Sequence, residues 1–171
     1  MGKNLTLTGM MGVGKSTIGK KLAKRLDYKF VDVDKIIEAE EGLSINSIFK
    51  SKSESYFRKI ENDITLSELK KESTVIALGG GAFLNSTIRR SAKKLSVSFW
   101  LDVPIHELIR RLKKSNQRPL LFKKNITDTV KKIYFDRKKT YNEADFKIKC
   151  SSLKSDQIVS RILNLYENAG N

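Results

Sequence analysis

The sequence contains few of the residues that define secreted, metal-binding or membrane proteins. It has one cysteine, so no disulfide bond can form within the chain. No apolar run approaches the roughly 20 residues that are needed to cross a bilayer. Nothing pairs the one histidine, His106, with a nucleophile or a metal-binding group, so any acid–base role falls to a carboxylate. We therefore expect a soluble, cytoplasmic protein that does not bind a membrane.

Acidic residues are also scarce, and the chain carries a formal net charge of +15 from 34 basic and 19 acidic residues. A protein this basic can bind nucleic acid. The lysines, however, are spread over almost every predicted helix, and aromatic side chains are not interleaved with them as a base-stacking surface requires. We therefore expect solvated helix faces, no nucleic-acid partner, and a positive field that attracts ATP and an anionic acceptor. A basic nucleotide- or nucleic-acid-binding protein is the alternative from another functional class.

One segment carries a specific chemical signal. Residues 9–16 read Gly-Met-Met-Gly-Val-Gly-Lys-Ser, which is the phosphate-loop pattern G-x-x-x-x-G-K-[ST]. A strand-like stretch precedes it and a helical spacing of apolar residues follows it, and this context favours a phosphate cradle over a glycine-rich turn. We expect backbone N–H groups and the helix N-terminus to bind phosphate oxygens, Lys15 to reach the outer phosphates and Ser16 to bind Mg²⁺. The predicted ATP contacts in this loop are Gly12, Val13, Gly14, Lys15, Ser16 and Thr17.

Strand-like segments alternate with helical ones, which is typical of a parallel sheet covered on both faces by helices. The 171 residues contain no repeat and no linker, so we expect a single α/β domain over residues 1–171. The predicted strands are Asn4–Thr8, Phe30–Asp32, Thr74–Leu78, Ser96–Leu101 and Phe146–Lys149. The predicted helices are Lys15–Leu26, Lys35–Glu41, Ile45–Phe49, Glu54–Lys71, Asn85–Lys93, Pro104–Lys113, Thr129–Glu143 and Asp156–Glu167, with Ser44, Asp128 and Ser155 as caps.

The connection over residues 115–127 is long and basic, and it contains Arg118 beside Pro119. A connection of this length in a compact domain is usually functional or disordered. In a phosphate-transferring protein, we expect it to be a mobile lid that closes over the nucleotide and brings Arg118 to the phosphates.

Metal-binding and acceptor-binding residues are expected at the carboxyl ends of the strands. Many phosphate-loop proteins hold the metal with an Asp at the end of the third strand, but here that strand leads into Gly79-Gly80-Gly81. The nearest acids are Asp32 and Asp34, which would project to the same side of an extended segment. We assign Asp32 to the Mg²⁺ shell and Asp34 to the acceptor hydroxyl, as hydrogen-bond acceptor and possible base. The alternative is that Asp34 only caps the following helix.

Taken together, these residues resemble the shikimate kinase family from Leu5 to about Asp145. The resemblance implies a three-layer P-loop fold with a five-stranded parallel sheet of order 2-3-1-4-5, a lid, and an acceptor-binding helical region over about residues 34–61. The sequence departs from the family pattern at Ser53, at Arg111-Leu112 and over residues 151–155. Beyond the phosphate loop, the matching pieces are Asp32-Val33-Asp34, Gly42-Leu43-Ser44-Ile45 with Ile48-Phe49, Phe57-Arg58-Lys59-Ile60-Glu61, Gly79-Gly80-Gly81-Ala82, Arg118-Pro119-Leu120-Leu121, and Arg137 with Tyr141.

The resemblance also implies an activity: transfer of the γ-phosphate of ATP to the 3-hydroxyl of shikimate, on the route to chorismate and the aromatic amino acids. It implies a monomer that needs Mg²⁺, held through Ser16 and Asp32. The implied catalytic residues are Lys15, Asp34 and Arg118, the implied shikimate-binding residues are Asp34, Arg58, Gly80, Gly81 and Arg137, and the implied nucleotide contacts outside the loop are Arg111 and Arg118. Ile45, Phe49 and Phe57 would wall the carbocycle. A gluconate-type sugar-acid kinase of the same fold is the nearest alternative.

Overall fold

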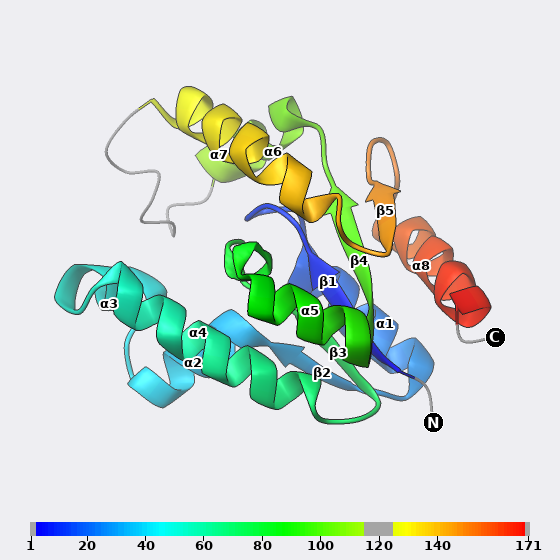
Figure 1. Cartoon of the computed structure of the whole chain (residues 1–171). Coiled ribbons are helices and arrows are strands. Elements are labelled where there is room, and N and C mark those ends of the chain that lie inside the picture. Colours follow the sequence, from blue (N-terminus) through cyan, green and yellow to red (C-terminus); the bar gives the residue numbers. More distant parts are fainter. Residues whose placement is uncertain (1–2, 115–124, 170–171) are drawn as a thin grey trace.

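The structure, a computed structural model, describes residues 3–114 and 125–169. Its centre is a five-stranded parallel sheet in the order β2-β3-β1-β4-β5 (Figure 1). This order confirms the predicted sheet, and each predicted strand agrees with an observed one to within a residue. The strands are β1 (Asn4–Thr8), β2 (Lys29–Asp32), β3 (Thr74–Ala77), β4 (Ser96–Asp102) and β5 (Phe146–Lys149).

The three central strands are buried along almost their whole length, as expected for a parallel sheet with both faces covered. In β1, Leu5 pairs with Val75 of β3 on one side and with Val97 of β4 on the other. Some of the polar side chains in this region are paired inside the sheet, since the Thr6 hydroxyl donates to Ser96 Oγ at 2.8 Å, but the buried Thr8 hydroxyl has no hydrogen-bond partner among the described residues. The sheet thus forms a rigid base from whose carboxyl edge the loops of the candidate site project.

Helices cover both faces of the sheet (Figure 1). Helices α1 and α8 lie together on one face, whereas α4, α5 and α7 lie on the other. The helices are α1 (Lys15–Leu26), α2 (Val33–Glu41), α3 (Ile45–Ser51), α4 (Glu54–Leu69), α5 (Ser86–Leu95), α6 (Ile105–Lys113), α7 (Ile126–Tyr141) and α8 (Ser155–Ala169), with a short 3₁₀ turn, η1 (Ala82–Leu84). Within the described ranges, none of the helices combines the length and the apolar character that a membrane crossing requires.

Two helices begin at least two residues earlier than the sequence predicts, and α8 begins one residue earlier. Helix α2 starts at Val33 because the Asp32 carboxylate caps it, accepting from the Lys35 N–H at 3.4 Å. The premise that Asp32 and Asp34 share one extended segment is therefore wrong. Helix α7 starts at Ile126, capped by Asn125 rather than by the predicted Asp128, so the end of the predicted lid is already helical. The predicted cap Ser44 is confirmed, and Ser155 is the first residue of α8.

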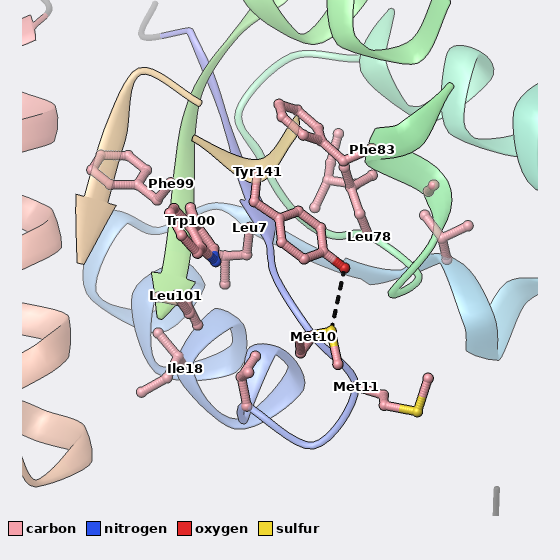
Figure 2. Packing of buried hydrophobic residues seen from close by; sticks show 14 of the residues in the cluster. Leu7, Met10, Met11, Ile18, Leu78, Phe83, Phe99, Trp100, Leu101 and Tyr141 are labelled. Atoms are coloured by element: carbon pink, nitrogen blue, oxygen red, sulfur yellow. Dashed lines mark hydrogen bonds between the residues drawn. The ribbon is translucent and has the colours of Figure 1, made fainter. Parts of the chain in front are cut away.

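The hydrophobic core continues directly beneath the phosphate loop. Met10 and Met11 of that loop are buried together with Trp100 of β4 and Tyr141 of α7. Figure 2 shows these side chains packed around the end of β1, with the Tyr141 hydroxyl turned toward Met10. The loop that is predicted to bind phosphate therefore rests on packed side chains, which restrict its movement.

Candidate active site

A cavity of about 690 Å³ lies beside the carboxyl ends of β2 and β3 and beneath α2 to α4. The phosphate loop forms one end of it, and a group of carboxylates and guanidinium groups surrounds the other. The sequence-predicted site residues that line this cavity are Gly12, Gly14, Lys15, Ser16, Thr17, Asp32, Asp34, Arg58, Gly80, Gly81 and Arg137. Residues from five separate parts of the chain thus share one cavity.

The phosphate-loop end is organised around the Lys15 ammonium group. Lys15 Nζ donates to the carbonyl oxygens of Gly9 and Met10, at 2.9 and 3.0 Å. These bonds fold the side chain back over its own loop, at the N-terminus of α1. A cation and a helix N-terminus side by side make this end of the cavity electropositive, as a polyphosphate site requires.

A pair of oxygen ligands lies next to this loop. The Ser16 hydroxyl donates to Asp32 Oδ2 at 2.5 Å, so a hydroxyl of α1 and a carboxylate of β2 meet at the cavity wall. Both are hard oxygen donors of the kind that Mg²⁺ prefers, and Mg²⁺ usually takes its remaining ligands from water and phosphate. The part of the chain that the structure describes contains no group of three His, Cys, Asp or Glu side chains suited to a metal. Two oxygen donors at the cavity wall fit a metal that takes its other ligands from water and phosphate.

The acceptor region of the cavity is built around the turn Gly79–Gly81. A Cβ atom at Gly79 would lie 2.7 Å from Asp34 Oδ1 and closer still to Glu61 Oε1. A Cβ atom at Gly81 would lie 2.5 Å from Arg58 Nη1. The absence of side chains on this turn is what allows two carboxylates and one guanidinium group to converge on it.

Arg58 and Glu61 form an ion pair on successive turns of α4. Arg58 Nη1 donates to Glu61 Oε2 at 2.6 Å, and the Glu61 side chain is only 2% exposed. Burial raises the pKa of Glu61, the nearby Asp34 raises it too, and Arg58 and Arg137 oppose the rise. The second oxygen, Glu61 Oε1, has no hydrogen-bond partner among the described residues.

Glu61 was missed as a site residue by reasoning from the sequence. Glu61 lies three residues after Arg58 on a predicted helix, and residues at that spacing face the same side. This spacing could have indicated that Glu61 lies beside Arg58 in the site. The same turn is reached from α7, since Arg137 Nη1 donates to the Gly80 carbonyl at 2.9 Å. Tyr141, also unassigned from the sequence, donates to the same carbonyl oxygen.

The apolar side chains predicted to wall an acceptor ring also line the cavity. Ile45 lies at the start of α3, and Phe49 of that helix packs against Phe57 of α4 with ring centroids 4.8 Å apart. The cavity therefore offers an apolar wall facing charged groups, a combination that suits a small ring bearing hydroxyls and a carboxylate.

Two of the predicted nucleotide contacts that the structure describes, Val13 and Arg111, are not among the cavity residues. Val13 is buried, and its carbonyl accepts from Arg111 Nη1 at 3.2 Å. Arg111 is held in turn by Glu107 on the preceding turn of α6, so it braces the phosphate loop, and its predicted contact with the nucleotide remains a prediction. Arg118 and most of the predicted lid lie outside the described residues.

A phosphate loop that shares its cavity with a separate, charged acceptor region, at the carboxyl edge of a parallel 2-3-1-4-5 sheet, defines a class: a small-molecule kinase of the P-loop fold. The family model described as shikimate kinase matches residues 11–167. The chain belongs to the shikimate kinase family.

Relatives and solved structures agree with this assignment. The shikimate kinase of Persephonella marina is 42% identical over 94% of this chain and 97% of its own, and that of Sulfurihydrogenibium sp. is 41% identical over 94% and 96%. Among solved structures, the shikimate kinase from Acinetobacter baumannii in complex with shikimate matches with a TM-score of 0.94 and 28% identity, covering 99% of this chain and 95% of that one. A gluconokinase from Sinorhizobium meliloti, at a TM-score of 0.61 and 14% identity, shares the fold alone.

Proposed function

We propose that this chain is a shikimate kinase that transfers the γ-phosphate of ATP to the 3-hydroxyl of shikimate, giving shikimate 3-phosphate and ADP. Family membership supports the reaction, and one observation carries its assignment to this site: a single cavity joins the phosphate loop to the cluster of Asp34, Arg58 and Glu61. We expect the enzyme to act as a cytoplasmic monomer in the biosynthesis of chorismate and the aromatic amino acids, with no nucleic-acid or membrane partner.

The phosphate-loop end is the donor half of the proposed site. Ser16 and Asp32 would hold Mg²⁺, which when bound neutralises charge on the phosphate oxygens. Lys15 would exchange its two carbonyl partners for oxygens of the transferring group, since an ammonium ion binds phosphate more strongly than neutral carbonyls. Such preorganised positive charge is the main catalytic contribution in phosphoryl transfer.

The other end is the acceptor half. The guanidinium groups of Arg58 and Arg137 would bind the shikimate carboxylate, because each can form two parallel hydrogen bonds that fix its orientation. The Asp34 carboxylate would accept the hydrogen bond of the 3-hydroxyl. As the bond from that oxygen to the γ-phosphorus forms and the bond to the bridging oxygen of ADP breaks, the hydroxyl proton passes to Asp34. Backbone N–H groups of Gly80 and Gly81 would complete the site.

We further propose that Arg118 reaches the phosphates when the lid closes and that Arg111 borders the nucleotide. The support for Arg111 is its contact with the phosphate-loop backbone. Arg118 rests on the resemblance of its sequence to the family pattern.

An ADP-release assay with Mg²⁺-ATP and either shikimate or gluconate tests the function. We expect turnover with shikimate and none above background with gluconate. Folded protein that consumes ATP with gluconate but not with shikimate would contradict the proposal. Omitting Mg²⁺ should abolish turnover, and Ser16→Ala should raise the Mg²⁺ concentration needed for half-maximal rate.

Asp34→Asn tests the acceptor half directly. The variant keeps the size of the side chain but loses the charge and the proton acceptor, so kcat should fall by about 10²- to 10³-fold. Nucleotide affinity, measured by calorimetry, should stay within about twofold of the original, because Asp34 lies against Gly79 of the acceptor turn, and the proposed phosphate contacts come from the phosphate loop.

The matched control for this variant is Asp63→Asn, an exposed position on α4. It should leave both kcat and nucleotide affinity unchanged. Normal turnover of Asp34→Asn would contradict a role of Asp34 in the reaction and leave it as a structural residue in the first turn of α2.

A further inference from the structure

One carbonyl oxygen at the centre of the site receives two hydrogen bonds from the same helix. The Gly80 carbonyl accepts from Arg137 Nη1 at 2.9 Å and from the Tyr141 hydroxyl. Arg137 and Tyr141 are four residues apart on α7, so their side chains leave the same face of that helix. A carbonyl oxygen has two lone pairs, and both are used here.

The Tyr141 hydroxyl lies where the two halves of the site meet. The side chain is fully buried, and its ring packs at 5.9 Å from the Trp100 ring. The hydroxyl lies 4.0 Å from Met10 Sδ in the phosphate loop, and Figure 2 shows it reaching over the end of β1 toward that sulfur. A Cβ atom at Gly80 would lie 3.3 Å from the backbone nitrogen of Met11, so the turn and the loop are in close contact here.

We propose that Tyr141 is a positioning residue for the acceptor half, acting through the peptide group that joins Gly80 to Gly81. In a trans peptide the carbonyl and the following N–H point in opposite directions. Because α7 fixes the Gly80 carbonyl, the N–H of Gly81 is directed away from α7. That N–H donates no backbone hydrogen bond among the described residues, and so it is kept available to a ligand in the cavity that Gly81 lines.

The second consequence concerns Arg137, and it rests on the proposed function. A guanidinium group has five N–H donors. With Tyr141 occupying one lone pair of the Gly80 carbonyl, Arg137 needs to give that oxygen only one of its donors. The remaining donors stay available for the acceptor carboxylate. Without the Tyr141 hydroxyl, the carbonyl competes more strongly for Arg137 or turns away from it.

Tyr141→Phe tests this role, because it removes the hydroxyl and keeps the ring that packs on Trp100. We expect KM for shikimate to rise about tenfold, the scale of one lost buried hydrogen bond. KM for ATP and kcat should each change less than about threefold, since the hydroxyl touches only the sulfur of Met10 on the loop side.

Tyr134→Phe is the matched control. Tyr134 is also on α7, three residues before Arg137, and its hydroxyl donates to Asp102 Oδ1 at 3.0 Å, away from the acceptor turn. This variant should lower the melting temperature about as much as Tyr141→Phe while KM for shikimate stays the same. Equal KM values for shikimate in the two variants would overturn the proposal and leave Tyr141 as a packing residue.

A measurement without substrate separates this proposal from the assignment of the reaction. The amide NMR signal of Gly81, recorded without substrate, should shift in Tyr141→Phe, because the peptide group that joins Gly80 to Gly81 loses one of its two anchors, and it should stay in place in Tyr134→Phe. If the original protein showed no turnover with shikimate, the proposed function would fail, and the Gly81 signal would still decide the positioning role. An unchanged Gly81 signal in Tyr141→Phe overturns that role.

Discussion

Both halves of the cavity depend on glycine, but for different physical reasons. In the phosphate loop, Gly12 and Gly14 have φ values of 80° and 100°, which side chains rarely allow, yet a Cβ atom at Gly14 would meet nothing within 4 Å. In the turn Gly79–Gly81, none of the three glycines has a positive φ, yet a Cβ atom at either end of the turn would collide with a charged side chain. The donor half needs glycine for its backbone shape, and the acceptor half needs it for space.

The difference reflects how each half is assembled. The phosphate loop is one continuous segment whose conformation is set by contacts within the segment. Lys15, for example, is held by carbonyls only five and six residues away. The acceptor half is assembled from α2, α4, the turn after β3, and α7, whose charged groups meet at a backbone with no side chains. A substitution should therefore damage the donor half through the backbone and the acceptor half through displaced side chains.

Gly81→Ala should give the larger effect on the acceptor half. The new Cβ would take the space of the Arg58 guanidinium group, which must swing away from the cavity. KM for shikimate should rise roughly 10²-fold, the usual cost of misplacing an orienting group by about 1 Å. Because Arg58 is the end of a flexible side chain, the melting temperature should change little. A large loss of stability with normal KM for shikimate would show that the turn needs glycine for its backbone after all.

Gly14→Ala should show the opposite pattern. Alanine at a φ of 100° is strained by about 1–2 kcal/mol, so the variant should be less stable, and nucleotide affinity should fall because loop N–H groups reorient. KM for shikimate should be nearly normal at saturating ATP. Thermal unfolding and calorimetry with ATP measure the two effects.

Gly42→Ala is the control for this strain. Gly42 follows α2 with a φ of 62° and also has open space around its Cβ position. The variant should lose stability without any loss of nucleotide affinity, because Gly42 does not line the cavity. If Gly14→Ala and Gly42→Ala reduced ATP affinity equally, the proposed role of the phosphate-loop backbone in binding ATP would be contradicted.

The same contrast explains what could be predicted from the sequence. The phosphate loop could be predicted because its chemistry and its geometry occupy adjacent residues. The sheet order followed from the resemblance to a known family, and the structure agrees with it. The pairing of Tyr141 with Gly80 joins residues 61 positions apart and depends on where α7 crosses the turn. No local pattern contains that information, and Arg137 and Arg58 were proposed through the family pattern rather than through their spacing.

The error at Asp32 has a local cause. A four-residue strand followed at once by a helix offers two interpretations of the segment Val31 to Asp34, extended or helical. The cap decides between them, because the Asp32 side chain accepts the Lys35 N–H and lets the helix begin at Val33. Asp32 and Asp34 still line one cavity, but they do so from a strand end and a first helical turn rather than from one face of a strand.

Glu61→Gln should give the smallest effect, and its pH dependence identifies the cause. Burial raises the pKa of Glu61 above its ordinary value of 4.5, so ionising this group opposes folding. That loss of stability should develop as the pH rises from about 4.5 through the raised pKa, and Glu61→Gln should lack it, because glutamine does not titrate. Denaturant unfolding between pH 4.5 and 8 measures the difference.

The effect of Glu61→Gln on shikimate binding should have the opposite sign. The substitution should relieve a loss of stability at high pH, but in the same pH range it should weaken shikimate binding. Above the raised pKa, the ionised Glu61 holds Arg58 through the bond at 2.6 Å, so in that pH range the glutamine variant should bind shikimate about three- to tenfold more weakly than the original. Below the raised pKa, Glu61 is protonated and has lost that advantage, so the two enzymes should converge in KM as the pH falls through that pKa. A constant ratio of KM across this range would mean that Arg58 is held by shape rather than by charge. Packing would then position the groups of the acceptor half, as the backbone does in the donor half, and the ion pair would contribute little.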